Sequence, residues 1–484
     1  MLPNKSTKIF SELNDFLASD EKGILKIMDI YKKLDLHKIK IGHHDFPQAS
    51  YRRSDLLLCL MMFPVFQVKN VYSYLDSTLN EFFEARKNTL YRLKNDSMVN
   101  WRHIVNLVNN RLLKTVAANT DTHSDGPRCL ILDDTDFVKT SYRTEHVGFI
   151  WSHVAHRTVL GFKGLFLGYW DSKSFFALDF SLHKERGKNQ KKPFGLNPKQ
   201  RSRQYSMPRD NGTPGRDREK ELVQDKISMA IKMVAKAISR KMHVDYVLMD
   251  SWFFCNAFVQ FIKKLSPKVH ILAIAKMGKT HYRFEGKDFT LKRLSEVMKN
   301  RKKVKRVKAL YLYSADVLVD FKGTPLKLFF CKNSKRGKWH VLATTNTKLG
   351  IIKAYQIYSI RWTVEVFFKE GKQHFGLGKS QSQDFNGQIA DISIAMMVYN
   401  VFSMVKRFES YETLGSLFRE TGQQTLELTV YMRIWQFILE LLQLIAEIVD
   451  GDFNELIVSN MKNTPENNRL LKLFDNKLYQ QIRA

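Results

Sequence analysis

Three carboxylates occur where the surrounding sequence favours apolar side chains. Glu365 lies within WTVEVFF (362–368), Asp134 follows the apolar run CLIL (129–132), and Asp250 follows YVLM (246–249). A half-buried carboxylate must pair with or bind a cation, because an isolated buried charge is unfavourable. Hard oxygen ligands favour Mg²⁺ or Mn²⁺, and two such ions can hold both oxygens of a phosphoryl displacement. We therefore predict that Asp134, Asp250 and Glu365 converge on two divalent ions.

Each carboxylate also has an ordinary structural explanation. Glu365 could form an i,i+4 ion pair with Arg361 beside a core, and the aspartates could cap helices or turns. The choice among the acids of LILDDTDF is open, because strand alternation puts Asp134 on one face and Asp133 on the other. Alternation alone does not say which face contains the site.

The elements that must position these residues are a helix and two strands. At about 100° per residue, a helix over 358–372 places Tyr358, Arg361, Glu365 and Lys372 on one narrow stripe bordered by apolar residues. Both aspartates are expected at strand ends, where α/β sheets bind their ligands. The order β-β-β-α-β-α-β predicts a mixed sheet with helices on its faces.

Other segments give the chain its expected organisation. Residues 1–120 show helical periodicity in two stretches separated by a polar connection, which is compatible with a helix-turn-helix or with a plain bundle. Residues 184–218 are basic and rich in proline and glycine, so we predict a mobile loop. Strand-like segments over about 280–346 predict a β-rich insertion, and the apolar run 431–449 predicts a packed amphipathic helix instead of a membrane span.

Composition limits the partners. The 484-residue chain has a formal net charge of +30, for which nucleic acid is the first candidate partner and an anionic membrane the second. The four cysteines are scattered without a CxxC pair, which favours a reducing cytoplasm and argues against zinc. The first residues predict no signal peptide, and no glycine-rich segment has the spacing of a nucleotide-phosphate loop.

The four residues Tyr358, Arg361, Glu365 and Lys372 resemble the Y-R-E-K signature of bacterial insertion-sequence transposases that carry an Asp-Asp-Glu triad. The segment LILDDTDF resembles that family's first-aspartate segment and favours Asp134, while YVLMDSWF resembles the second. The resemblance covers about residues 125–400. It implies a ribonuclease H-like fold of the α/β class, interrupted by a β-rich insertion and flanked by helical N-terminal and C-terminal regions.

The same resemblance implies cut-and-paste DNA transposition through a DNA hairpin. Asp134, Asp250 and Glu365 would hold two Mg²⁺ or Mn²⁺ ions without a nucleotide cofactor, and Tyr358, Arg361 and Lys372 would contact phosphates. Trp339 and Trp362 match aromatics that support a flipped base, although either could be a core residue. The partners would be transposon-end DNA and target DNA, bound by a homodimer in the bacterial cytoplasm at the nucleoid.

The implied domain boundaries follow these segments. They are a helical DNA-binding region (1–124), a catalytic domain (125–279 and 347–380), a β-strand insertion (280–346) and a helical C-terminal region (381–484). The alternative functions are a related metal-dependent nuclease that cannot join DNA and a DNA-binding protein without catalysis.

Overall fold

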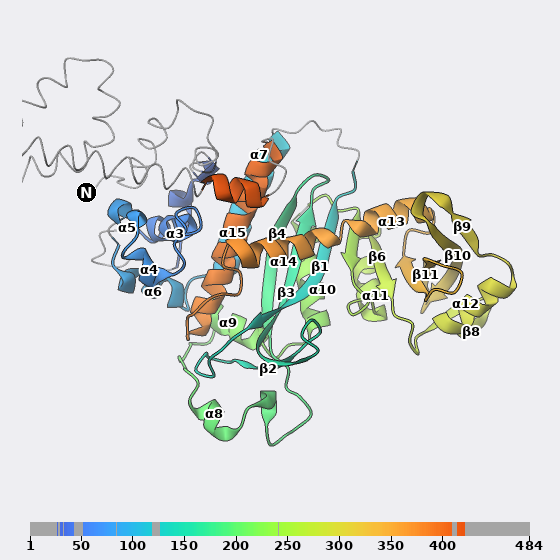
Figure 1. Cartoon of the computed structure of the whole chain (residues 1–484), viewed down its shortest axis with the longest axis horizontal. Coiled ribbons are helices and arrows are strands. Elements are labelled where there is room, and N and C mark those ends of the chain that lie inside the picture. The colour runs from blue at the N-terminus through green and yellow to red at the C-terminus, as the bar shows by residue number, and fades with distance from the viewer. Residues whose placement is uncertain are drawn as a thin grey trace, which may run out of the picture. The chain divides into compact units, whose positions relative to one another are not determined.

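The computed structural model describes residues 27, 30–31, 33–42, 52–83, 85–118, 126–240, 242–408 and 414–421. The chain divides into two compact units. We call the first the helical unit (residues 1–114, 373–381 and 389–484) and the second the sheet unit (residues 115–372 and 382–388). Figure 1 labels their elements. Each unit is described by itself below.

The helical unit is built from short helices in its N-terminal part and one long helix near its end. The elements are η1 (Leu36–Lys38), α3 (Arg53–Met62), α4 (Val71–Tyr74), α5 (Thr78–Phe83), α6 (Lys87–Asn95), α7 (Trp101–Ala118) and α15 (Phe385–Phe408). Within this unit, the Asn400 amide donates to the Asn109 side chain over 2.7 Å, which joins α15 to α7. The prediction of two helices with a polar connection was wrong. The first predicted stretch is divided between α3, α4 and the start of α5, and the polar connection contains α6.

One membrane-length helix occurs in the described part of the chain. Phe385–Arg407 is long and apolar enough to cross a bilayer, but 94% of its apolar window is buried within the protein, as in a core helix. The helix predicted at 431–449 lies outside the described residues.

The sheet unit contains twelve strands in one mixed sheet. Along the sheet the order is β2-β3-β1-β5-β6-β12-β11-β10-β7-β8, with β4 paired to β3 and β9 to β10. The first part comprises β1 (Cys129–Val138), β2 (Gly148–Ser152), β3 (Arg157–Trp170), β4 (Phe175–His183), β5 (Tyr246–Met249) and β6 (His270–Ala275). The predicted mixed sheet is confirmed, and β2 is an additional strand that the sequence did not reveal.

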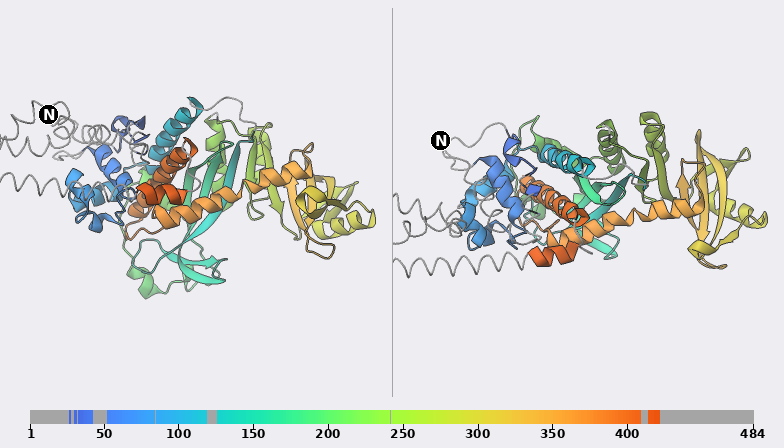
Figure 2. Two further views of the ribbon diagram at one scale, coloured as in Figure 1. Left: turned by 45° about the horizontal axis from the view of Figure 1, so that its top comes forward. Right: turned by 90° about the horizontal axis from the view of Figure 1, so that it is seen from above.

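Three parallel strands form the centre of this sheet. β1 pairs with β5, and β5 with β6, in parallel register. The helix α10 (Lys226–Ser239) leads into β5, α11 (Asn256–Leu265) connects β5 to β6, and both bury their apolar faces. Figure 2 shows these green helices on one side of the sheet and the orange helices α13 (Ile351–Ser359) and α14 (Trp362–His374) on the other. A strand covered on both faces is apolar along its whole length, as β5 is here.

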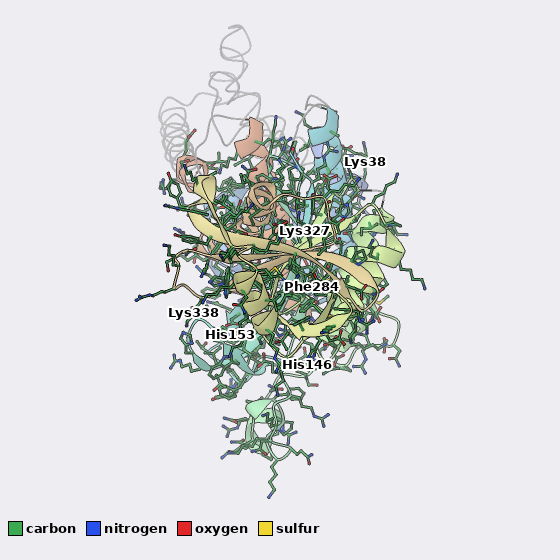
Figure 3. The ribbon with its side chains drawn as sticks, turned by 90° about the vertical axis from the view of Figure 1, so that its right-hand side faces the viewer. Lys38, His146, His153, Phe284, Lys327 and Lys338 are labelled. Carbon is green, nitrogen blue, oxygen red and sulfur yellow. The ribbon has the colours of Figure 1, made fainter. Side chains whose placement is uncertain are left out.

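The strands of the predicted insertion extend the same sheet. They are β7 (His281–Phe284), β8 (Lys287–Thr290), β9 (Lys305–Val307), β10 (Leu312–Phe321), β11 (Thr324–Lys332) and β12 (His340–Thr344). β12 pairs antiparallel with β6, so the hydrogen-bonded ladder continues from the centre outward. The segment also contains a helix, α12 (Leu291–Asn300), that the sequence did not indicate. Figure 3 views this end of the sheet, with Phe284, Lys327 and Lys338 labelled.

The expected helix over 358–372 is two helices. α13 (Ile351–Ser359) ends before Ile360, and α14 (Trp362–His374) begins after Arg361. At the junction the backbone amides of Ile360 and Arg361 bond three residues back, to Ile357 and Tyr358. This tighter turn interrupts the α-helical repeat. Tyr358 therefore lies on α13, Arg361 in the turn, and Glu365 and Lys372 on α14.

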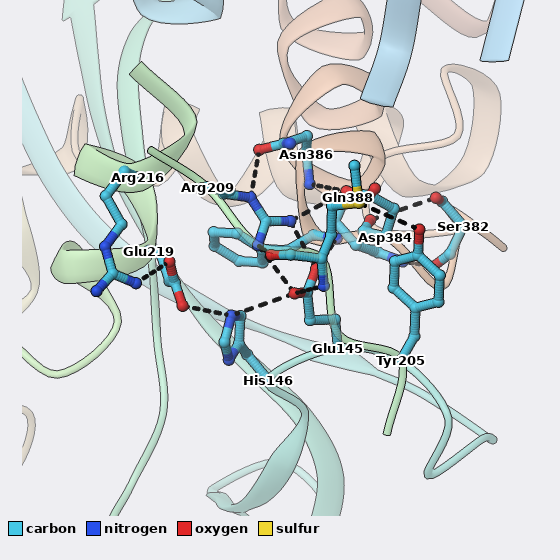
Figure 4. A network of polar contacts seen from close by, with 12 residues as sticks. Glu145, His146, Tyr205, Arg209, Arg216, Glu219, Ser382, Asp384, Asn386 and Gln388 are labelled. Atoms are coloured by element: carbon cyan, nitrogen blue, oxygen red, sulfur yellow. Dashed lines mark hydrogen bonds and ion pairs between the residues drawn. The ribbon is translucent and has the colours of Figure 1, made fainter. Parts of the chain in front are cut away.

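Residues 184–218 contain two further helices, α8 (Pro198–Ser202) and the start of α9 (Pro214–Glu221). The segment is anchored by Arg209, whose side chain is fully buried. Its guanidinium pairs with Glu145 at 2.6 Å and with Asp384 at 3.2 Å, and it donates to Asn386 at 3.1 Å (Figure 4). The segment is therefore not loop throughout, because it contains helices and is anchored at Arg209 by a buried ion-pair network. Its predicted mobility stays a prediction.

Candidate active site

Two aspartates meet where the parallel pairing of β1 and β5 ends. The last paired residues are Leu132 and Met249, so Asp133 and Asp250 are the next residues on each strand. β5 stops there, but β1 continues to Val138 by pairing with β3. The prediction that Asp134 ends its strand was therefore wrong. The Asp250 carboxylate accepts a hydrogen bond from the Trp252 amide, which orients it at the sheet edge.

The two faces of β1 separate Asp133 from Asp134. Asp133 pairs in register with Phe166, whose ring contacts Phe367 and Phe368 of α14 at centroid distances of 5.6 and 5.3 Å. Asp133 therefore shares the face that α14 covers. Asp134 points to the opposite face, where its carboxylate pairs with the ammonium group of Lys226 at 2.6 Å. Lys226 is the first residue of α10.

Arg361 joins the first aspartate to the glutamate. Its two terminal nitrogens bond different acids, one to Asp133 Oδ2 and the other to Glu365 Oε1, each over 2.6 Å. The side chain of Arg361 is only 10% exposed, whereas that of Glu365 is 37% exposed. The third guanidinium nitrogen, Nε, is buried and has no hydrogen-bond partner among the described residues. The fork thus connects β1 to α14 across the edge of the sheet.

The other two signature residues attach the same helices to the two strands. The Tyr358 hydroxyl donates over 3.4 Å to the carbonyl of Met249, the residue before Asp250. The Lys372 ammonium donates to the Thr135 hydroxyl at 2.7 Å and to the Asp136 carbonyl at 3.1 Å. Tyr358 therefore anchors α13 on β5, while Lys372 anchors α14 on β1. All three non-acidic signature side chains thus bind protein groups.

The charge balance of the site favours an additional cation. Burial raises the pKa of Asp133 to about 7, Arg361 opposes the rise, and the carboxylates of Asp134 and Asp250 add to it. One guanidinium does not offset the burial and the neighbouring acids together. Burial also lowers the pKa of the Lys372 ammonium, with a further contribution from Lys163, while Asp136 counteracts it. The acids thus form a site that a divalent ion would stabilise.

The predicted aromatic residues lie in different places. Trp362 is 58% exposed and begins α14, with its ring centre 5.4 Å from the Arg361 guanidinium. Trp339 is half-buried just before β12, and its ring contacts Phe330 and Lys332, both of β11. Trp362 is therefore adjacent to the acids in sequence and in space. The observed contacts of Trp339 are all within the outer strands.

Sequence reasoning missed two residues beside the site. Lys226 holds Asp134, and its ammonium lies 4.0 Å from the ring centre of Trp252, which is 45% exposed. Trp252 could have been found from the sequence, because it follows the strand-end acid Asp250 by two positions. No sequence signal pointed to Lys226, because its partners come from β1 and from the end of β5.

The acids fit a metal site by their chemistry, although Arg361 separates two of them. Asp133, Asp250 and Glu365 offer only carboxylate oxygens, the donors that Mg²⁺ and Mn²⁺ prefer. Within the described ranges, no three His, Cys, Asp or Glu side chains are close enough together to hold one ion. Asp134 does not join Glu365, since the two residues face opposite sides of β1. The assignment of Asp134 as a metal ligand stays a prediction, and the arrangement favours Asp133.

Two family models match parts of the chain. Residues 225–401 match the family model of the transposase DDE domain, and residues 43–273 match that of the DDE superfamily endonuclease. Two DDE-type family models therefore match this chain. Asp250 lies in both matched segments, Glu365 in the first and Asp133 in the second. No curated protein matches the sequence.

One solved structure with some likeness is described as "Cryo-EM structure of piggyBac transposase synaptic complex with hairpin DNA (SNHP)". The likeness has a TM-score of 0.43 at 13% sequence identity and covers 87% of this chain and 80% of that chain. This TM-score is too low to establish a shared fold.

Proposed function

We propose that this protein is a DNA transposase whose metal-binding acids are Asp133, Asp250 and Glu365. The observation that carries the proposal is the bridge from Asp133 through Arg361 to Glu365, next to Asp250 at the edge of the parallel strands. The two DDE-type matches support the reaction class. We further propose a ribonuclease H-like core over 125–279 and 347–380, with helical regions before and after it and an insertion at 280–346.

The proposed mechanism assigns each side chain one task. Asp133, Asp250 and Glu365 would hold divalent ions. Such ions would polarise the scissile phosphate and activate a water molecule or the 3′-hydroxyl of the DNA. Tyr358 and Lys372 hold α13 and α14 against β5 and β1, which fixes Glu365 relative to the aspartates. Asp134 and Lys226 neutralise each other on the opposite face. The positive charge of Lys226 thereby reduces the repulsion between the carboxylates of Asp134 and Asp133.

Basic side chains on the surface of the protein suit a DNA substrate. The chain carries a net charge of +30, and most basic residues of 299–308 are exposed. Trp362 and Trp252 are exposed beside the acids, where an aromatic ring can stack on an unpaired base. We propose that Arg361 and Lys372 contact phosphates when DNA is bound, that Trp339 also faces DNA, and that two copies bind a pair of ends.

A joining assay tests the proposal against its closest alternative. Purified protein is incubated with Mg²⁺, a target plasmid and DNA from the regions that flank the gene. A transposase produces nicked ends and joined products, whereas a nuclease produces only nicked ends. We expect Glu365→Gln to abolish both products without loss of DNA binding.

The matched control is Glu370→Gln, on the same helix. Five residues along a helix place Glu370 far around the axis from Glu365. We expect it to retain activity. Unchanged cleavage by Glu365→Gln would remove Glu365 from the mechanism.

A further inference from the structure

Arg361 lies between two of the three acids that the proposed function assigns to metal binding. Its two terminal nitrogens hold one oxygen of Asp133 and one of Glu365, both at 2.6 Å. These two acids come from a strand and from a helix far apart in the sequence, and the guanidinium is what links them. Under the proposed function, on which this inference rests, both acids are metal ligands. The free protein therefore uses its own cation where the reaction needs a divalent one.

A guanidinium and a metal ion compete for such oxygens. Mg²⁺ requires its oxygen ligands at about 2.0–2.1 Å in near-octahedral order, so an ion that takes Asp133 Oδ2 and Glu365 Oε1 displaces the N–H donors of Arg361 from them. The positive charge of Arg361 also repels the incoming ion at short range. An ion on these two oxygens and the observed Arg361 bridge therefore exclude each other.

DNA offers Arg361 another partner. Arginine forms forked hydrogen bonds to phosphate as readily as to carboxylate. Arg361 lies in the turn between α13 and α14, directly before the exposed Trp362. Its buried Nε has no hydrogen-bond partner among the described residues, so the bridge satisfies the guanidinium incompletely. A phosphate at this turn can therefore draw the side chain away from the acids.

We propose that Arg361 blocks the metal site in the free protein and that a DNA phosphate releases it. Binding of DNA then raises the affinity for metal, and by linkage metal raises the affinity for DNA by the same factor. The device restricts the assembly of the cutting site to protein that holds its substrate. A permanent structural bridge is the competing explanation, in which Arg361 only positions Asp133 and Glu365.

Manganese binding to the full-length protein separates these explanations without measuring activity. Free Mn²⁺ is followed by electron paramagnetic resonance during titration, with and without duplex DNA from the region flanking the gene. The Glu365→Gln protein defines the background, including Mn²⁺ held by the DNA itself. The test variant is Arg361→Gln, which keeps hydrogen-bonding groups and removes the charge. Circular dichroism checks that each variant is folded.

The block predicts a specific pattern. We expect Arg361→Gln to bind Mn²⁺ more tightly than wild type in the absence of DNA, by about 5- to 150-fold, the usual range of coupling between sites. We expect DNA to tighten binding by a similar factor in wild type and to have little further effect in the variant. Lys369→Gln is the charge-matched control, because Lys369 is exposed on the same helix as Glu365 and has no role in the proposed site. It should change Mn²⁺ affinity much less.

Other results would overturn the inference in distinguishable ways. If Arg361→Gln binds Mn²⁺ no more tightly than wild type while wild type exceeds the Glu365→Gln background, Arg361 is a positioning residue and only the inference fails. If Lys369→Gln gives the same gain as Arg361→Gln, the effect is general electrostatics and the inference also fails. If wild type never exceeds that background, with or without DNA, the proposed metal-dependent function fails as well.

Discussion

The two neighbouring aspartates of β1 provide the most direct test of the site. We consider Asp133→Asn and Asp134→Asn, which remove one charge each and preserve side-chain shape. The structure makes the pair well matched, since each aspartate forms one ion pair of 2.6 Å, with Arg361 and Lys226 respectively. The variants differ mainly in the face of the strand that they alter.

The expected loss of stability is similar for both variants. The paired side chains are 15% and 10% exposed at Asp133, and 26% and 16% exposed at Asp134. Breaking a fully buried pair costs about 3–5 kcal/mol and an exposed pair about 0–1 kcal/mol, so each variant should lose about 1–3 kcal/mol. A difference in folding therefore cannot account for a large difference in activity.

The expected loss of activity is very different. If Asp133 is a metal ligand, Asp133→Asn should slow DNA nicking by about 10⁴-fold, the order found when one member of a catalytic group is removed. Asp134 acts at most through its neighbours, for which losses of about 10- to 100-fold are the upper range.

Nicking of a plasmid that carries the gene with its flanking DNA is measured in Mg²⁺, and thermal unfolding is recorded for each variant. Equal losses, or a larger loss for Asp134→Asn, would refute the assignment by strand face.

Three further predictions concern stability and DNA binding. His183 is buried, and burial is the main cause that lowers its pKa to about 4. Below about pH 6.5 the unfolded chain therefore binds more protons at this residue than the folded protein does. The free energy of unfolding should fall by about 3 kcal/mol as the pH decreases from about 6.5 to about 4. Unfolding curves should accordingly depend less on pH in His183→Gln. Arg209→Gln leaves two carboxylates buried without their partner and should cost about 3–5 kcal/mol, measured by urea unfolding, and adding Glu145→Gln should recover part of it. Trp362→Ala should weaken DNA binding by about 1–3 kcal/mol in fluorescence anisotropy without changing the salt slope, because a stacked base carries no counterion; a changed slope would contradict a stacking role.

Much of the sheet was predictable because its strands are locally distinct. β5 and the first four residues of β1 are short apolar runs bounded by turns or polar residues, and their complete burial is the physical origin of that pattern. Asp250 and Glu365 stood out for the same reason, as acids within or beside such runs. The Y-R-E-K spacing also selected Arg361 and Lys372, which contact the strands of the site.

The choice between Asp133 and Asp134 required the tertiary structure. Alternation along β1 separates them onto two faces, but only the packing of Phe166 against α14 shows which face has Glu365. The break between α13 and α14 was also hidden, since Ile360 and Arg361 are compatible with a continuous helix in sequence. The local sequence pattern thus predicts a strand or helix and which residues share each of its faces. Which other element packs on each face depends on the rest of the chain.

Long-range ion pairs show the same division. Nothing near Arg209 in the basic segment 184–218 indicates burial, yet Glu145 and Asp384 reach it from distant parts of the chain. The sequence by itself determined the strands, the candidate acids and the charge that suits DNA. Only the tertiary structure decided which acids share a face and which cation lies between them, because side-chain pairing across elements depends on distances that no local pattern encodes.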